Sequence, residues 1–266
     1  MAIGDLLRHP DLWRADEIGS PAGAVAATSS GFDALDAHLP GNGWPQAGLV
    51  ELMLGTAGIG ELKLLAPALR ALSRVARWIA WINPPFIPYA PALAALDIDI
   101  SRILLVHPRQ HEEALWAMEQ ASKSGTCSAV LGWLDERHLT LTATRRLQLA
   151  AKQGGTLGCL FRPEAAAAGA SMAELRLKLE PGPRSALDVS IVKRRGGWPV
   201  SGLNIQVDSQ LSSEDIEKHM LLWRHGRPVK RPEAATTQDP AAPSPNTRYI
   251  CGGDFQETLP PGDRLH

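Results

Sequence analysis

Apolar and polar residues follow two alternating patterns through the middle of the chain. Five short runs, rich in Leu, Ile, Val or Trp and bounded by Gly, Pro or polar residues, are typical of buried strands. They cover residues 49–54, 78–82, 102–107, 129–134 and 156–161. Between most of them, apolar residues recur with the helical period, over residues 62–73, 110–123 and 139–153. This order predicts an α/β fold in which helices cover both faces of a mainly parallel sheet.

The pattern changes after Ser171. Residues 173–181 and 185–195 alternate apolar and polar side chains, which indicates strands with one solvated face. Such strands are typical of antiparallel pairs at the side of a sheet. We therefore expect an antiparallel C-terminal extension of the parallel core.

Composition divides the chain into four predicted segments. An amphipathic stretch with an Ala/Gly/Ser-rich link comes first, and a region dense in Pro, Thr, Asp and Gln comes last. The segments are an N-terminal arm and linker (1–30), an α/β core (31–208), an amphipathic helix (209–225) and a disordered tail (226–266).

The helix predicted over residues 209–225 is a candidate docking element. It begins with Ser, Glu and Asp, which cap helix N-termini. Ile216, Met220 and Trp223 then fall on one helical face. We expect this face to cover the core or to meet a partner protein.

A glycine-rich loop follows the first predicted strand. The segment GTAGIGEL lies between a strand and a helix, which is the place of a phosphate-binding loop. Its glycines are Gly55, Gly58 and Gly60. Glu61 stands where the motif requires Lys, and Leu62 where it requires a hydroxyl. A carboxylate repels a triphosphate and leucine offers Mg²⁺ no oxygen, so the loop is expected to be vestigial, with no cofactor.

Two further strand ends lack the acids that nucleotide hydrolysis needs. Pro85 follows the second strand, where a catalytic glutamate would be expected. Gly132 lies near the end of the fourth, where an aspartate would help to hold Mg²⁺. Asp135 comes after that strand and is expected to be a loop residue or a helix cap. We infer a protein that is not an enzyme; a P-loop ATPase with an unusual loop is the alternative.

Composition restricts the compartment and the partners. The chain has 27 basic and 28 acidic residues and a formal net charge of −1, so any contact with nucleic acid must be a local patch. Cys127, Cys159 and Cys251 are far apart and lack metal-ligand spacing, which predicts neither a disulfide framework nor a metal site. Since no apolar run has the length of a signal peptide or a membrane span, we expect a cytoplasmic protein.

Several segments in order resemble the RecA superfamily over residues 30–208 and, within it, the ImuA family. They include SGFDALDAHLPGNGWPQAGLVELM, GIGELKLLAPAL, WINPPFIPYAPALAALDID, RRLQLAAK and KRRGGWP. The resemblance implies a RecA-like core with a degenerate phosphate loop. It also implies a non-catalytic accessory role in SOS-induced translesion DNA synthesis. The implied partners are the polymerase-like protein ImuB, RecA, an error-prone polymerase acting indirectly and, as a further candidate, single-stranded DNA. The competing interpretation is a SulA-like cell-division inhibitor that targets the tubulin-like division protein.

Two basic clusters are candidate contacts with RecA or DNA. They are Lys193, Arg194, Arg195 and Trp198 near a strand end, and Arg145 and Arg146 on a predicted helix. Lys193 and Arg195 are two apart on a strand and are expected to project the same way. For both clusters, solvated surface charges without a specific partner are the alternative.

Overall fold

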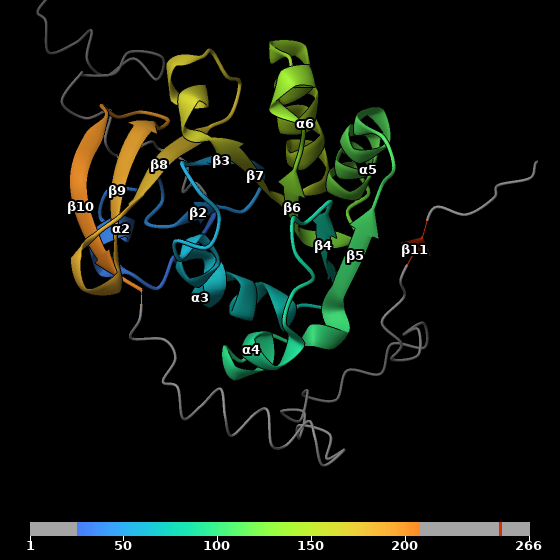
Figure 1. Cartoon of the computed structure of the whole chain (residues 1–266), viewed down its shortest axis with the longest axis horizontal. Helices are drawn as coiled ribbons and strands as arrows, with labels where there is room; N and C mark the ends of the chain where they lie inside the picture. Colours follow the sequence, from blue (N-terminus) through green and yellow to red (C-terminus); the bar gives the residue numbers. More distant parts are fainter. Residues whose placement is uncertain (1–25, 208–249, 252–266) are drawn as a thin grey trace, which may run out of the picture.

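The computed structural model describes residues 26–207 and 250–251 of the chain. Within these residues the main feature is a nine-stranded sheet in the order β10-β9-β8-β3-β7-β6-β4-β5-β11 (Figure 1). Its strands are β3 (Gly48–Leu54), β4 (Trp78–Ile82), β5 (Ile103–His107), β6 (Cys127–Trp133), β7 (Leu157–Pro163), β8 (Leu175–Pro181), β9 (Ala186–Lys193), β10 (Val200–Gln206) and β11 (Ile250–Cys251). A separate antiparallel pair joins β1 (Ala27–Thr28) and β2 (Trp44–Pro45).

Helices cover both faces of the sheet, as the apolar pattern predicts. The α-helices are α2 (Asp33–Asp36), α3 (Glu61–Ser73), α4 (Ala90–Ala95), α5 (His111–Lys123) and α6 (Leu141–Gly154). Leu64, Leu65 and Leu69 of α3 belong to the apolar core on one face. Met118 of α5 and Leu147 of α6 belong to the core on the other face. In Figure 1 the pair α5 and α6 lies above the central strands and α3 with α4 lies below them.

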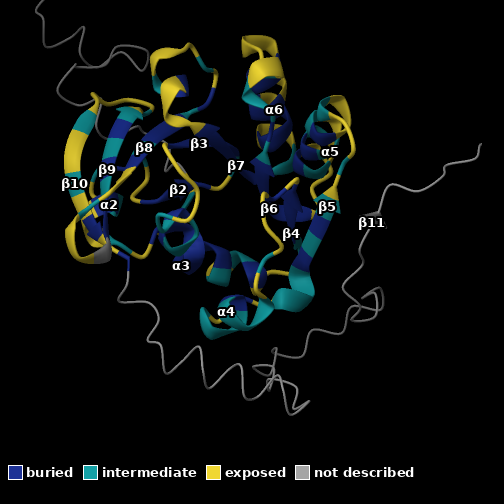
Figure 2. Cartoon of the chain, in the orientation of Figure 1, coloured by how far each residue is buried: buried dark blue, intermediate teal, exposed yellow. Residues whose placement is uncertain are grey.

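The central strands are apolar because neither of their faces meets water. Every residue of β3 is buried, and β7 is buried at all positions except its last. At the other end of the sheet, β10 is mostly exposed or half-buried. Figure 2 shows this contrast between the dark central strands and the exposed residues of β10 and α6. A continuous apolar run therefore predicts the interior of this sheet, whereas alternation predicts its side.

The five strands and three helices predicted for the core are confirmed, with ends that differ by up to two residues. The direction of one strand is a correction. We expected both C-terminal strands to be antiparallel, but β8 runs parallel to β3 and antiparallel to β9, so the antiparallel part of the sheet begins at β9 and continues in β10. Alternation reports one solvated face and carries no information on strand direction. The sequence pattern also missed α4 and β10.

Several predicted features lie outside the described residues. They are the N-terminal arm through residue 25, the helix over 209–225 with Ile216, Met220 and Trp223, and nearly all of the tail over 226–266. Among the described helices, none combines the length and the apolar character that crossing a bilayer requires. The same part of the chain holds no group of three His, Cys, Asp or Glu side chains placed for a metal ion.

Two cysteines lie in the interior of the sheet. Cys127 of β6 is 3% exposed and Cys159 of β7 is fully buried. Both are free thiols. Burial raises the pKa of Cys159 to about 12, because a thiolate would be poorly solvated there. The thiol of Cys159 is therefore part of the core.

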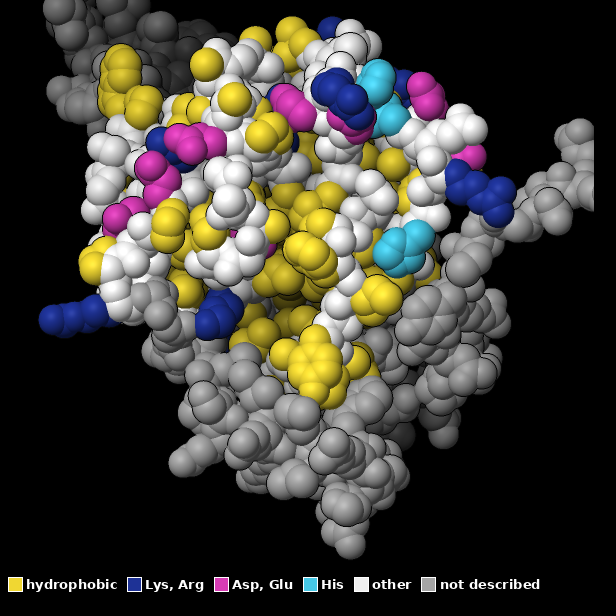
Figure 3. Space-filling view, in the orientation of Figure 1, with side chains coloured by type: hydrophobic (Ala, Val, Ile, Leu, Met, Phe, Trp, Pro, Cys, Tyr) yellow, Lys and Arg dark blue, Asp and Glu magenta, His cyan; other side chains and the backbone are white. Residues whose placement is uncertain are grey.

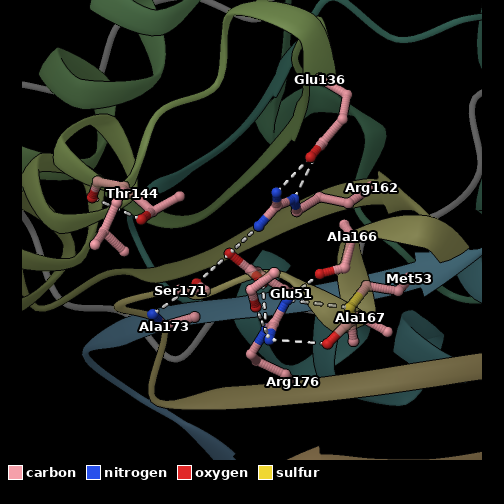
Figure 4. A network of polar contacts seen from close by, with 12 residues as sticks. Glu51, Met53, Glu136, Thr144, Arg162, Ala166, Ala167, Ser171, Ala173 and Arg176 are labelled. Carbon is pink, nitrogen blue, oxygen red and sulfur yellow. Dashed lines mark hydrogen bonds and ion pairs between the residues drawn. The ribbon is translucent and has the colours of Figure 1, made fainter.

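A buried charge network joins β3 to β7 and β8 (Figure 4). The fully buried carboxylate of Glu51 accepts hydrogen bonds from Arg162 Nη1 at 2.9 Å and from Arg176 Nε at 2.6 Å. Arg162 also donates through Nε to Glu136 at 3.0 Å. Burial by itself lowers the pKa of Arg162, but the hydrogen bonds to Glu136 and the charge of Glu51 outweigh it and raise that pKa. Each buried charge is tolerated because it is paired.

Candidate functional site

The glycine-rich loop after β3 is folded around its own carboxylate. Gly58 and Gly60 have left-handed backbone angles, with φ of 88° and 117°, and Gly60 precedes the first turn of α3. The Glu61 side chain turns back into the loop and is 6% exposed. Its Oε1 accepts from the Gly58 N–H at 2.8 Å and its Oε2 from the Gly60 N–H at 3.1 Å. An anion from the chain itself thus takes up the N–H groups that would cradle a phosphate.

Leu62, the residue after Glu61, is part of the packing at the start of α3. The residue is half-buried and packs against the apolar core on the α3 face of the sheet. A hydroxyl at this position would be available to a metal ion, whereas the leucine side chain contributes to packing. Glu61 and Leu62 therefore both contribute to the local structure at the start of α3.

We expect Glu61→Ala to lower the free energy of unfolding by about 1–2 kcal/mol, because two loop N–H groups lose their acceptor. Glu61→Gln keeps one carbonyl oxygen as an acceptor, so its free energy of unfolding should fall less than that of Glu61→Ala. Urea denaturation of the two variants measures the difference. Mg-ATP should leave the melting temperature of the wild-type chain unchanged, and a concentration-dependent rise would contradict this interpretation of the loop.

The position expected for a metal-binding aspartate has no room for a side chain. A Cβ atom added to Gly132 of β6 would lie 2.4 Å from Sδ of Met118, which is fully buried in α5. Carbon and sulfur atoms cannot approach so closely, so the buried Met118 side chain would have to move. The absence of a side chain at Gly132 thus leaves the space that Met118 of α5 fills.

An aromatic cluster occupies the carboxyl ends of the neighbouring strands. Trp133 of β6 stacks on Phe161 of β7, with ring centroids 4.3 Å apart and planes 4° from parallel. Trp81 of β4 packs against Trp133, with the centroids of these two rings 5.8 Å apart. The three rings lie with the apolar core on the α3 face. Aromatic side chains therefore take the place where nucleotide hydrolysis would need acidic ones.

The remaining acid positions follow the same trend. Pro85 is exposed in the segment between β4 and α4. Asp135 caps the short 3₁₀ helix over Glu136–His138 by accepting from the Arg137 N–H at 3.1 Å, which confirms the expectation of a cap. The hydrogen bonds from Arg137 hold the pKa of Asp135 well below its usual range. Its carboxylate is thereby engaged in local structure.

The same segment between β4 and α4 exposes large apolar side chains. Phe86, Ile87 and Tyr89 are 74%, 80% and 50% exposed. Figure 3 shows hydrophobic side chains gathered in the middle of the face that Figure 1 presents, with charged side chains mainly around its rim. Sequence analysis considered this segment for the missing acid at Pro85 and for the family resemblance, but not as a contact surface. The signal that it missed is the run of apolar residues between prolines, which cannot continue a strand or a helix.

The structure separates the six predicted basic and aromatic contact residues. Arg145 lines a hollow of about 430 Å³ together with Lys193 and Arg195. Arg146 faces away from this hollow and forms an ion pair with Glu119 of α5. Arg145 of the helix cluster thus shares one surface with Lys193 and Arg195 of the strand-end cluster. Arg146 does not line this surface.

The other two predicted residues belong to the turn between β9 and β10. Arg194 donates through Nε to the carbonyl oxygen of Trp198 at 3.0 Å and through Nη1 to the carbonyl oxygen of His38. Arg194 therefore has a structural role. The Trp198 side chain is 85% exposed and does not line the hollow.

Comparison with known proteins identifies the family. The family model described as "Cell division inhibitor SulA" matches residues 51–158. The cell division inhibitor SulA of Edwardsiella piscicida is 38% identical over 123 residues, which span 45% of this chain and 71% of that protein. The chain belongs to the SulA family. The SulA protein of Photorhabdus laumondii is 34% identical over 117 residues, which span 44% of this chain and 65% of that protein, slightly under two thirds of its length.

A solved SulA structure also matches part of the chain. The crystal structure of SulA from Pseudomonas aeruginosa is 30% identical, covers 43% of this chain and 97% of that one, and superposes with a TM-score of 0.36. The family model covers the chain from β3 into β7. This part includes the helices α3 to α6 and the exposed segment that precedes α4. Residues 159–207, with β8, β9 and β10, follow the segment matched by the SulA model.

This membership corrects the functional expectation from the sequence. The ImuA assignment and its role in translesion synthesis are wrong, as are ImuB, RecA and DNA as partners, because the family model and the relatives are SulA cell division inhibitors. The SulA-like alternative fits instead. Several segments that carried the ImuA resemblance, such as GIGELKLLAPAL and RRLQLAAK, lie within residues 51–158, so they could not distinguish the two families.

Proposed function

We propose that this chain inhibits bacterial cell division by binding a protein of the division machinery, with no catalytic step of its own. The observation that carries the proposal is the match of residues 51–158 to the SulA family. The tubulin-like division protein is the proposed target. The carboxylate of Glu61 inside the phosphate loop and the closed position at Gly132 support a binding function over nucleotide hydrolysis. We also propose that residues 31–208 form a degenerate RecA-like core, for which the strand, glycine-rich loop and helix order is the support.

The surface proposed for this binding is the segment over residues 84–89. It lies within the family match and holds Phe86 and Ile87 among the most exposed large apolar residues of the described chain. Three prolines in the segment restrict the backbone, so little conformational entropy is lost when a partner covers these side chains. Apolar side chains held outward in this way are typical of protein contacts.

Overproduction in a rod-shaped bacterium tests the proposal. We expect the wild-type chain to produce long filaments without septa, and the double variant Phe86→Ser with Ile87→Ser to leave cell length normal. Trp116→Ser is the matched control, because Trp116 is 62% exposed on α5 and lies outside the segment. Sedimentation of the purified tubulin-like division protein with each variant provides the direct measurement. The proposal would be contradicted if cells divided normally while the wild-type chain was present in soluble form. It would also be contradicted if cells formed filaments but the purified chain did not sediment with the tubulin-like division protein.

A further inference from the structure

A basic groove lies between α6 and the end of β9. Its α6 wall consists of Arg145, Gln148, Leu149 and Lys152, spaced three, four and seven residues apart and therefore on one helical face. Its other wall holds residues 172–174, which precede β8, and Lys193 with Arg195. The hollow has a volume of about 430 Å³. Much of its lining thus comes from residues after 158, beyond the segment that the SulA model matches.

The groove carries an excess of positive charge that the described residues do not neutralise. Four cations and one acid line it, and the acid, Glu174, is paired with Lys152 at 2.7 Å. Lys193 donates to the carbonyl oxygen of Ser171 at 2.9 Å and meets no carboxylate in the described chain. The side chains of Arg145 and Arg195 form neither a hydrogen bond nor an ion pair with any residue of the described chain. Guanidinium groups without a partner are the natural ligands of carboxylates.

A buried amide supplies a second, independent observation. Gln148 lines the groove and is only 7% exposed. Its Oε1 accepts from the Leu49 N–H at 2.7 Å, which fixes the orientation of the amide. Its Nε2 is buried and has no hydrogen-bond partner in the described structure. A buried donor without an acceptor costs stability, so a ligand that brings an oxygen to this point gains a favourable contact.

We propose that this groove binds an acidic peptide segment of another protein, with carboxylates meeting Arg145, Arg195 and Gln148 Nε2 and an apolar side chain packing between Leu149 and Met172. These two apolar residues are 56% and 42% exposed at the groove. The inference goes beyond the proposed function and does not depend on it.

The lining favours a peptide over a nucleic acid. None of the described residues that line the groove is aromatic, so bases would have nothing on which to stack. Mixed charge and apolar contact suits a segment in which acidic and aliphatic residues alternate.

Fluorescence anisotropy with the full-length chain tests the proposal. The probe is a fluorescein-labelled peptide of repeated Glu-Glu-Leu, and its control is the same peptide with Gln in place of Glu. We expect the acidic peptide to bind at least about tenfold more tightly than its control, as expected when charge complementarity sets the affinity. Equal affinities, or no binding of either peptide, would overturn the proposal. A labelled oligothymidylate of equal charge that binds more tightly than the acidic peptide would also overturn it.

Variants then locate the site. Arg145→Glu and Arg195→Glu should each weaken binding about tenfold, whereas Arg109→Glu, an exposed arginine outside the groove, should not change it. Gln148→Glu keeps the acceptor for Leu49 but replaces the Nε2 donor with an oxygen, so it should also weaken binding. Glu174→Gln removes the acid from the lining and should tighten binding, a gain that misfolding cannot produce. Equal effects at Arg109 and Arg145, or weaker binding by Glu174→Gln, would place the peptide elsewhere.

Discussion

Glu51→Leu should lower the free energy of unfolding by about 3–5 kcal/mol, because it leaves a buried guanidinium without its carboxylate. Arg176 is 4% exposed and donates to the carbonyl oxygens of Ala166 and Gly169 at 2.7 and 2.9 Å. Its more distant contacts, at 3.5 Å, are to the carbonyl oxygen of Ala167 and to the sulfur of Met53. Carbonyl oxygens solvate a cation only partly, so the charge would remain uncompensated. Arg162 keeps its bonds to Glu136 and should contribute less to the loss. Urea denaturation measures the change.

Two controls separate buried charge from ordinary packing. Adding Arg176→Leu to Glu51→Leu removes the orphaned cation, so the double variant should recover about 1–2 kcal/mol of what the single variant lost. Glu164→Leu makes the same substitution in the half-exposed pair with Lys178 at 2.8 Å and should change stability little, because water screens that pair. A double variant less stable than Glu51→Leu would show that Arg176 stabilises the chain mainly through the carbonyl oxygens.

Gly132→Asp, which introduces the acid that the sequence analysis considered at this position, should prevent stable folding. The new Cβ would overlap Met118, and the carboxylate would enter the apolar core between α5 and the sheet. Arg162 lies on the same face, two residues beyond the register partner of Gly132, but it is already paired with Glu51 and Glu136. Overpacking costs about 1–3 kcal/mol and an unpaired buried charge costs several more, which together approach the whole stability of a typical domain. We expect the variant to be insoluble or to lose its cooperative unfolding transition by circular dichroism.

The packing part of this effect can be isolated with neutral residues. Gly132→Ala should destabilise the chain through the contact with Met118 alone, and Met118→Ala should destabilise it through the cavity left behind. In the double variant the new methyl group enters that cavity, so the combined loss should be smaller than the sum by at least about 1 kcal/mol. Strictly additive losses would mean that the two residues do not contact each other.

The phosphate loop illustrates how far local sequence can lead. Glu61 and Leu62 are adjacent in the chain, and the charge of one and the apolarity of the other already predict a loop unsuited to nucleotide. The hydrogen bonds from Gly58 and Gly60 to Glu61 are also local, yet they depend on the left-handed angles of the loop. Sequence reasoning could predict that the loop is unsuited to a nucleotide, but it could not show that the carboxylate of Glu61 accepts hydrogen bonds from the loop itself.

The functional expectation failed for a different reason. Several of the segments that carried the ImuA resemblance lie within the SulA match, and no single residue type in them reports a partner. A binding function depends on which side chains are exposed together. The segment with Phe86 and Ile87 and the groove with Arg145 and Arg195 therefore emerged only from the folded chain.

The sequence by itself determined the α/β core, the helices on both faces and the departure of Glu61 and Leu62 from the phosphate-loop motif. Hydrophobic period and residue identity are local properties, so they can be read one segment at a time. Only the tertiary structure decided the direction of β8, the pairing of Glu51 with Arg162 and Arg176, the contact between Gly132 and Met118 and the assembly of the basic groove. Each of these depends on which distant segments become neighbours, and that is settled by packing the whole sheet and its helices at once.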